Sequence, residues 1–272
     1  PSAEIPMTTA KRAAYPSPAR RLTVARDAET GGYYLSEVKI GRRFALTVSD
    51  LYKAEVWRAS PSAIQTWDAD DFDAVVVQDE EAGTLEITAT AKADAGVVLT
   101  LRARAVEDGW EFLPPVVAST STAYAVRSVA WPGLGVLPFG EADDFFAACS
   151  FGSGYARREP HRNAGFVSVS PDNPAYFGLY DAETKSCLMM EARDDTLRLK
   201  TITALAAGSH VYVEFRHFAD RRFALENSWG DDYDYVVRLI AFTGRTQDGR
   251  LCAYDIAEIG RASCRERVFR AV

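Results

Sequence analysis

The sequence predicts an all-β fold: a large antiparallel sandwich of two packed sheets with little helix. Strand-length segments that alternate apolar and polar residues recur along the 272 residues, and turn residues separate them. By comparison, few segments show the 3.6-residue periodicity of an α-helix. Because 47% of the residues are hydrophobic, one domain of this size has ample material for a buried core. We therefore expect a single β-sandwich domain over residues 21–247.

The elements follow in order along the chain. Residues 1–20 are rich in Pro, Ser, Ala and Arg, which predicts an extended lead-in. The clearest strand is residues 97–105, whose odd positions are apolar and whose Thr100, Arg102 and Arg104 share the other face. Asp108-Gly109 then predicts a hairpin turn into Trp110. The other predicted strands are residues 33–40, 85–90, 123–130, 164–170, 175–180, 187–192, 196–202, 210–215 and 235–241.

Two helices and one long loop complete the expected order. Residues 50–57 fit a short surface helix, and residues 248–258 fit the start of a linker helix that follows Asp248-Gly249. Residues 131–140 are rich in Pro and Gly and predict a structured loop.

Charge and cysteine content exclude several classes of partner. The net charge is −7, and such an acidic surface repels phosphate backbones and anionic lipid, so neither nucleic acid nor membrane is expected. No apolar stretch approaches the roughly 18 residues that span a bilayer. The widely spaced cysteines, Cys149, Cys187, Cys252 and Cys264, favour small buried hydrophobes over a disulfide framework.

The last residues resemble something other than natural protein. Residues 259–268 match the translation of a widely used sequencing adapter, so residues 259–272 are expected to be a non-native tail of a truncated bacterial gene model. The natural sequence is then expected to extend to Glu258. The chain starts without Met, which leaves its N-terminus and its localisation open.

No catalytic or cofactor motif is present in the sequence. It has no GxSxG, HExxH, Walker loop or GxGxxG after a strand, so we assign no catalytic residue and expect no cofactor. His161, His210 and His217 lack metal-ligand spacing, and a hydrogen-bonded structural role is favoured for each. A glycosidase needs two facing carboxylates, for which the best-placed candidates are Glu141, Asp143 and Asp144.

Two acidic runs offer oxygen ligands. Asp231, Asp232 and Asp234 follow Trp229-Gly230 and are a calcium candidate, although they lack the spacing of an EF-hand and a solvated turn is the favoured interpretation. The run of Asp68, Asp70, Asp71 and Asp73 is interpreted in the same way.

Aromatic residues give the remaining indication of function. Sugar rings stack on exposed Trp and Tyr faces while polar neighbours bind their hydroxyls. Trp110 lies in an alternating strand and is expected to be buried, whereas burial and exposure are nearly balanced for Trp131 and Trp229. The candidate carbohydrate-binding residues are therefore Trp131, Trp229, Tyr233 and Glu141.

Several motifs together resemble a known family. They are the hairpin ending in residues 110–112, the Trp-Pro-Gly segment at 130–135, and residues 176–181, 188–192 and 248–258. In this order they resemble the N-terminal β-supersandwich of large bacterial glycoside hydrolases, notably the group related to endo-α-N-acetylgalactosaminidases. The resemblance implies a sandwich that supports a (β/α)8 barrel, which would carry the acid and nucleophile and which this chain lacks.

Three hypotheses for function follow. The preferred one is a non-catalytic sandwich from a carbohydrate-active hydrolase, with its own catalytic domain as partner and carbohydrate as a further contact. The second is a self-sufficient β-sandwich glycosidase or polysaccharide lyase. The third is a structural or adhesive surface module.

Overall fold

The computed structural model describes residues 22–29, 32–38, 45–47, 49–79, 81–106, 109–137, 143–149, 152–154, 166–169, 176–181, 186–194, 198–207 and 210–243. Within these ranges the chain forms nineteen strands and one short 3-10 helix, and no α-helix. The strands are β1 (Leu22–Arg26), β2 (Tyr33–Val38), β3 (Ala45–Thr47), β4 (Lys53–Arg58), β5 (Ala63–Trp67), β6 (Phe72–Asp79), β7 (Thr84–Ala91), β8 (Val97–Val106), β9 (Gly109–Phe112), β10 (Val116–Ser119), β11 (Tyr124–Leu137), β12 (Asp143–Cys149), β13 (Gly152–Gly154), β14 (Phe166–Val169), β15 (Tyr176–Asp181), β16 (Ser186–Asp194), β17 (Lys200–Ala207), β18 (His210–Phe218) and β19 (Tyr235–Thr243); the 3-10 helix is η1 (Ala69–Asp71).

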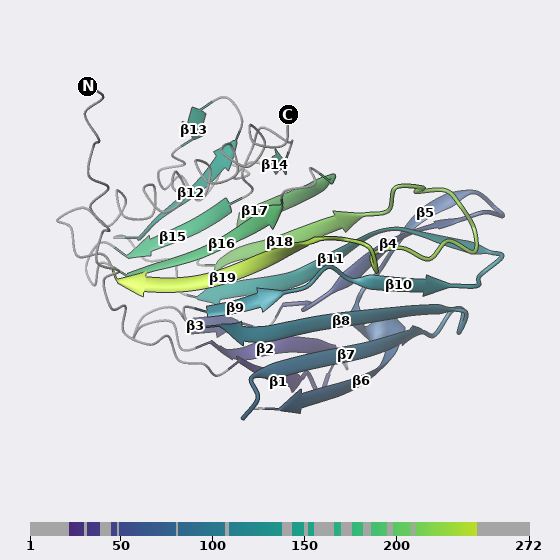
Figure 1. The fold of residues 1–272 in the computed structure, drawn as a ribbon, viewed down its shortest axis with the longest axis horizontal. Coiled ribbons are helices and arrows are strands. Elements are labelled where there is room, and N and C mark those ends of the chain that lie inside the picture. Colours follow the sequence, from purple (N-terminus) through teal and green to yellow (C-terminus); the bar gives the residue numbers. More distant parts are fainter. Residues whose placement is uncertain are drawn as a thin grey trace, which may run out of the picture.

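Two large antiparallel sheets make up the sandwich (Figure 1). The ten-stranded sheet has the order β13-β12-β15-β16-β19-β9-β8-β7-β6, and β10 also pairs with β8. The seven-stranded sheet has the order β14-β17-β18-β11-β4-β5, and β3 also pairs with β11. A separate hairpin joins β1 to β2. The predicted all-β sandwich is therefore confirmed.

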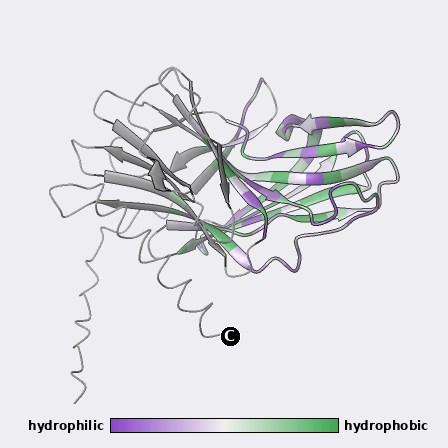
Figure 2. Ribbon diagram, turned by 90° about the horizontal axis from the view of Figure 1, so that it is seen from above, coloured by the Kyte–Doolittle hydropathy of each residue, from purple (hydrophilic) through white to green (hydrophobic). Residues whose placement is uncertain are grey.

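The core forms where the inner faces of the two sheets meet. In β8 the buried residues alternate with outward ones, so Leu99 and Leu101 are enclosed while Arg102 and Arg104 are exposed, as the sequence pattern predicts. Ile87 of β7 pairs with Leu101 in register and is also fully buried. Figure 2 shows hydrophobic and hydrophilic residues alternating along such strands. Burial of this apolar face on folding is the main stabilising contribution.

Strand β11 crosses the seven-stranded sheet and replaces part of the predicted loop. The segment 131–137 continues β11 instead of leaving the sheet, which corrects the expectation of a loop at 131–140. Pro132 lies within a register shift between Ala130 and Gly133, the kind of irregularity at which a strand tolerates a residue without an N–H group. Gly133 resumes the pairing with β18 opposite Glu214.

The predicted helix at residues 50–57 is wrong, because residues 53–58 form β4 between β11 and β5. Ala54 and Val56 are fully buried while Lys53 and Glu55 are not, a period of two that a strand satisfies and a helix does not. The preceding Leu51 and Tyr52 are also fully buried. Sequence analysis also missed seven strands: β1, β3, β5, β6, β10, β12 and β13.

Several expectations lie outside the described residues. These are the lead-in at 1–20, the linker helix at 248–258 and the tail at 259–272. Among the residues that are described, no helix has the length and apolar character needed to cross a membrane.

Candidate functional site

Three of the predicted sugar-binding residues contribute to one buried cluster between the sheets. The rings of Trp229 and Tyr233 lie 5.7 Å apart, and those of Tyr233 and Tyr235 stack at 6.0 Å. Tyr235 in turn stacks on His217, with a centroid distance of 5.5 Å. The Nε2 atom of His217 lies 2.7 Å from the carbonyl oxygen of Trp131. The cluster therefore runs from the segment after β18 to the centre of β11.

Trp131 is held on all sides in this cluster. Its side chain is fully buried, packs edge-on against Phe112 at 5.3 Å, and donates its indole N–H to the Leu113 carbonyl oxygen at 3.1 Å. Trp229 is 8% exposed and donates its indole N–H to the Val126 carbonyl oxygen. Both indoles therefore contribute to packing, and neither presents an open face for a sugar in this structure.

His217 makes hydrogen bonds at both ring nitrogens, and the one at Nδ1 links the two sheets. Its Nδ1 lies 2.6 Å from the Tyr235 hydroxyl, while Nε2 lies beside the Trp131 carbonyl oxygen. Since Nε2–H donates to that carbonyl, Nδ1 of the neutral ring accepts the Tyr235 hydroxyl proton. Complete burial lowers the pKa of His217 to about 3, so the ring is neutral at ordinary pH. It has the structural role that the sequence favours.

Lys200 brings a further titratable group to this cluster. Its side chain is 2% exposed, its Nζ donates to the Arg198 carbonyl oxygen at 2.8 Å, and it lies 4.4 Å from the centre of the Tyr235 ring. Burial lowers the pKa of Lys200 to about 7. Burial also raises the pKa of the Tyr235 hydroxyl. These are groups suited to acid–base chemistry, but they are enclosed by the two sheets.

An ion-pair network covers the outer end of the cluster. The Arg198 guanidinium lies 4.0 Å over the Tyr233 ring and donates to Asp220 at 2.9 Å and to Asp232 at 2.8 Å. Burial, the largest cause, raises the pKa of Tyr233 to about 12. The Tyr233 hydroxyl donates to the Phe218 carbonyl oxygen, so both ends of this side chain are engaged.

The structure does not bring the calcium candidates together. Asp231, Asp232 and Asp234 are all exposed, and Arg198 already holds the carboxylate of Asp232. Throughout the described ranges, the one trio of carboxylates gathered within 4.8 Å belongs to the other acidic run. It consists of Asp68, Asp70 and Asp71 on and beside η1, and Asp71 caps this helix by accepting the Asp68 N–H.

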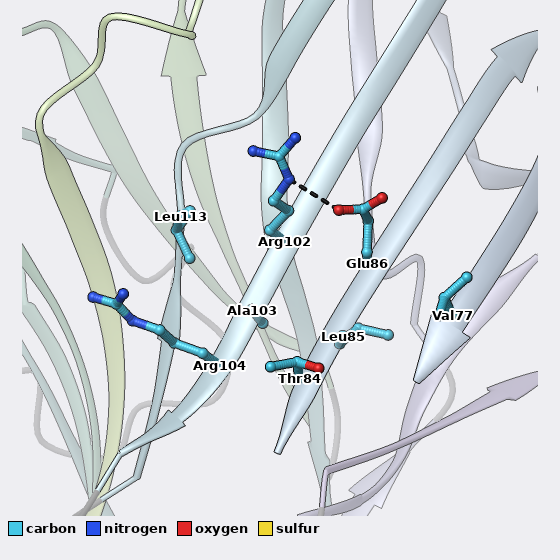
Figure 3. Close-up of a pocket in the computed structure, with 8 residues that line it drawn as sticks. All are labelled: Val77, Thr84, Leu85, Glu86, Arg102, Ala103, Arg104 and Leu113. Carbon is cyan, nitrogen blue, oxygen red and sulfur yellow. Dashed lines mark hydrogen bonds and ion pairs between the residues drawn. The ribbon is translucent and has the colours of Figure 1, made fainter. Parts of the chain in front are cut away.

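A shallow depression of about 420 Å³ lies over β6, β7 and β8 (Figure 3). Its charged side chains are paired: Arg102 Nε lies 3.1 Å from Glu86, and Arg104 Nη2 lies 2.8 Å from Glu111. Figure 3 shows Arg102 reaching across to Glu86 on the neighbouring strand, with Val77 at the border. The depression thus combines apolar surface with neutralised charge.

The remaining carboxylate candidates are placed only in part. Glu141 lies outside the described residues, so its role as a sugar contact stays a prediction. Asp143 and Asp144 begin β12 and pair with Asp181 and Tyr180 of β15. They therefore lie in a strand of the ten-stranded sheet and not in a loop.

Sequence reasoning missed the buried lysine and the role of His217 as a link between sheets. Lys200 falls within a predicted strand, but a Lys in a strand ordinarily points to solvent. The partners of His217 come from β11 and β19, and no local pattern predicts such a long-range contact. The predicted strand at residues 210–215 ends before His217, so it gave no indication of the direction of this side chain.

Comparison with known proteins gives loose structural matches. No protein-family model matches the chain. No curated protein matches it either. Among solved structures, the GH36 α-galactosidase AgaB of Geobacillus stearothermophilus is 11% identical, with a TM-score of 0.40, and the match covers 72% of this chain and 30% of that chain. The galactosidase domain of the α-galactosidase-sucrose kinase AgaSK is 15% identical, with a TM-score of 0.38, over 84% of this chain and 31% of that chain. The GH36 α-galactosidase AgaA A355E D548N of G. stearothermophilus in complex with raffinose is 11% identical, with a TM-score of 0.40, over 80% of this chain and 34% of that chain. The chain spans about a third of each of these glycoside hydrolase chains.

Proposed function

We propose that this chain is a non-catalytic β-sandwich domain of a carbohydrate-active hydrolase, whose catalytic domain lies outside it. The observation that carries the proposal is the enclosure of His217, Tyr235 and Lys200 between the two sheets. A general acid or base has to come within hydrogen-bond reach of a substrate atom. These three side chains have satisfied contacts and no exposed face, so they fit a role in joining the sheets.

Two glutamates of the ten-stranded sheet support the same proposal. Glu86 and Glu111, on the outer face of the ten-stranded sheet, each pair with an arginine. A glycosidase acid has to face the substrate and donate a proton to it, whereas these two carboxylates are held by arginine side chains. The paired charges suit a surface that contacts another domain.

The proposed assignment to a carbohydrate-active enzyme is supported by sequence motifs. The Trp-Glu-Phe hairpin end at 110–112 and the Trp-Pro-Gly segment at 130–135 resemble those of the endo-α-N-acetylgalactosaminidase-related sandwich. In the structure these motifs meet, because Phe112 packs against Trp131 across the sandwich. The motifs thus form a structural joint of the domain, which is consistent with a supporting role.

A hydrolysis assay tests the proposal. The purified chain is incubated with a panel of nitrophenyl α- and β-glycosides that includes galactosides and N-acetylgalactosaminides. We expect nitrophenol release no faster than in buffer. Turnover that saturates with substrate and rises in proportion to chain concentration would overturn the proposal, and would favour a self-sufficient glycosidase.

A further inference from the structure

A second aromatic cluster lies on the outside of the sandwich, far from the predicted tryptophans in sequence. Trp57 of β4 and Ile64 of β5 are register partners, so their side chains share one face of the seven-stranded sheet. Phe223, from the segment between β18 and β19, packs edge-on against Trp57 at 5.6 Å and 85°. We call Trp57, Ile64 and Phe223 the aromatic platform. The connection that carries Phe223 runs beside β4 and β5 in Figure 1.

The platform exposes apolar surface although its side chains are held in place. Phe223 and Ile64 are each 55% exposed. The Trp57 indole N–H donates to the Ser62 hydroxyl at 3.0 Å, which fixes the ring edge. Water does not favour exposed phenyl surface, and a fixed, exposed aromatic cluster is typical of a contact site.

The backbone around Phe223 is also fixed. Ala224 N–H donates to the Arg221 carbonyl oxygen, and Asn227 Nδ2 donates to the same oxygen, which closes a turn. Glu226 N–H donates to the Ser121 carbonyl oxygen at 3.0 Å and ties this turn to the body of the domain. Phe223 is therefore presented on an ordered turn, so little conformational entropy is lost when a ligand stacks on it.

A polar pair borders the platform. The Arg127 guanidinium lies 4.6 Å from the centre of the Phe223 ring, and its Nη1 donates to Glu55 Oε1 at 2.9 Å. Flat apolar rings beside a group that both donates and accepts hydrogen bonds match the two sides of a sugar, its C–H face and its hydroxyl edge.

We propose that the aromatic platform binds a neutral sugar ring, with Phe223 under the C–H face and the Arg127–Glu55 pair at the hydroxyls. The size of the platform favours a sugar over a protein. Three side chains of at most about 250 Å² each, no more than roughly half of it exposed, offer roughly 400 Å², whereas a stable protein interface needs about 800 Å² from each partner. The pair Arg127–Glu55 is neutral overall, which favours an uncharged glycan over an acidic one.

A glycan array that presents neutral and acidic oligosaccharides tests this proposal with fluorescently labelled chain. We expect binding to at least one neutral oligosaccharide, and at least tenfold weaker binding by Phe223→Ala. Phe223→Tyr keeps the ring and should retain the binding. Val77→Ala, which removes exposed apolar surface from the other sheet, is the matched control and should leave it unchanged. Equal melting temperatures of the four proteins show that folding is intact.

Absence of binding to every oligosaccharide would overturn the proposal, and so would equal binding by Phe223→Ala. Self-association on size-exclusion chromatography that Phe223→Ala abolishes would also overturn it, because the platform would then contact a second copy. Each of these outcomes leaves the non-catalytic role untouched, since hydrolysis tests that role separately.

Discussion

Single residues explain why the chemistry-bearing groups of this domain belong to its interior. His217 and Tyr235 come from opposite sheets and share a hydrogen bond of 2.6 Å, while Nε2 of His217 binds the Trp131 carbonyl oxygen within its own sheet. A buried polar group without a partner has lost its hydrogen bonds to water and gains none in return, which destabilises the fold. The cluster therefore favours one arrangement of the two sheets over alternatives that separate these residues.

Replacing the Tyr235 hydroxyl tests this link. Tyr235→Phe leaves Nδ1 of His217 buried without its partner, and we expect the free energy of unfolding to fall by about 1–3 kcal/mol. Urea denaturation followed by tryptophan fluorescence measures the change. Tyr124→Phe is the control, with an expected change below about 0.5 kcal/mol, since its ring contributes mainly through packing against Trp67. Equal losses in the two variants would contradict the proposed role of the link.

The pKa of Lys200 predicts a pH dependence. The pKa is lowered to about 7 in the folded chain and returns to about 10.5 on unfolding, so the unfolded chain binds more protons between these values. Stability contributed by this site therefore rises with pH from about 7 to about 10. The Lys200→Met variant lacks this titratable group. We therefore expect its free energy of unfolding to exceed that of wild type by the largest amount at pH 6–7, and this difference to shrink by pH 9. A constant difference between the two proteins across this range would contradict the assignment.

At the scale of elements, the alternation of apolar and polar residues predicts the strands correctly, whereas local amino-acid composition predicts a helix or a loop where the chain forms a strand. Residues 97–105 alternate over their whole length and match β8 closely. The segment 50–57 alternates as well, but its Leu, Lys, Ala and Glu content favours a helix until β11 is placed beside it. The Pro/Gly-rich stretch at 131–137 misleads in the same way, because a register shift lets the strand continue. Register shifts depend on the neighbouring strand and leave no local signal.

Gly133 shows how closely these elements approach. An added Cβ would lie 2.1 Å from the Asp50 carbonyl oxygen, and the Gly133 N–H donates to the Leu51 carbonyl oxygen at 2.8 Å. We expect Gly133→Ala to lower the free energy of unfolding by about 2–4 kcal/mol, because backbone has to move on both sides. Thermal denaturation measures the loss.

Gly96→Ala is the matched control for this substitution. Its added Cβ would lie 2.8 Å from the Thr120 hydroxyl and 3.0 Å from an Asp94 carboxylate oxygen, both side-chain atoms that can shift. The expected loss is below about 1 kcal/mol. Indistinguishable melting temperatures for wild type and Gly133→Ala would show that the segment before β4 does not constrain β11 as described.

At the scale of the whole molecule, the two outer faces differ in character. The ten-stranded sheet presents Val75 and Val77 beside the paired Arg102 and Glu86, whereas the seven-stranded sheet presents the aromatic platform. Sequence analysis predicted the sandwich, whereas its candidate sugar-binding residues Trp131 and Trp229 lie in the core. Once residues 53–58 are assigned as a strand, Trp57 falls on the face opposite to the buried Ala54 and Val56, which predicts that it points outward.

We propose that this sandwich supports a catalytic domain encoded elsewhere in the same gene. Sequencing the genomic locus and translating the reading frame downstream of Glu258 tests this proposal most directly. We expect alternating strand and helix patterns of a (β/α)8 barrel with two carboxylates at the ends of strands. A stop codon within a few residues of Glu258 would contradict the claim.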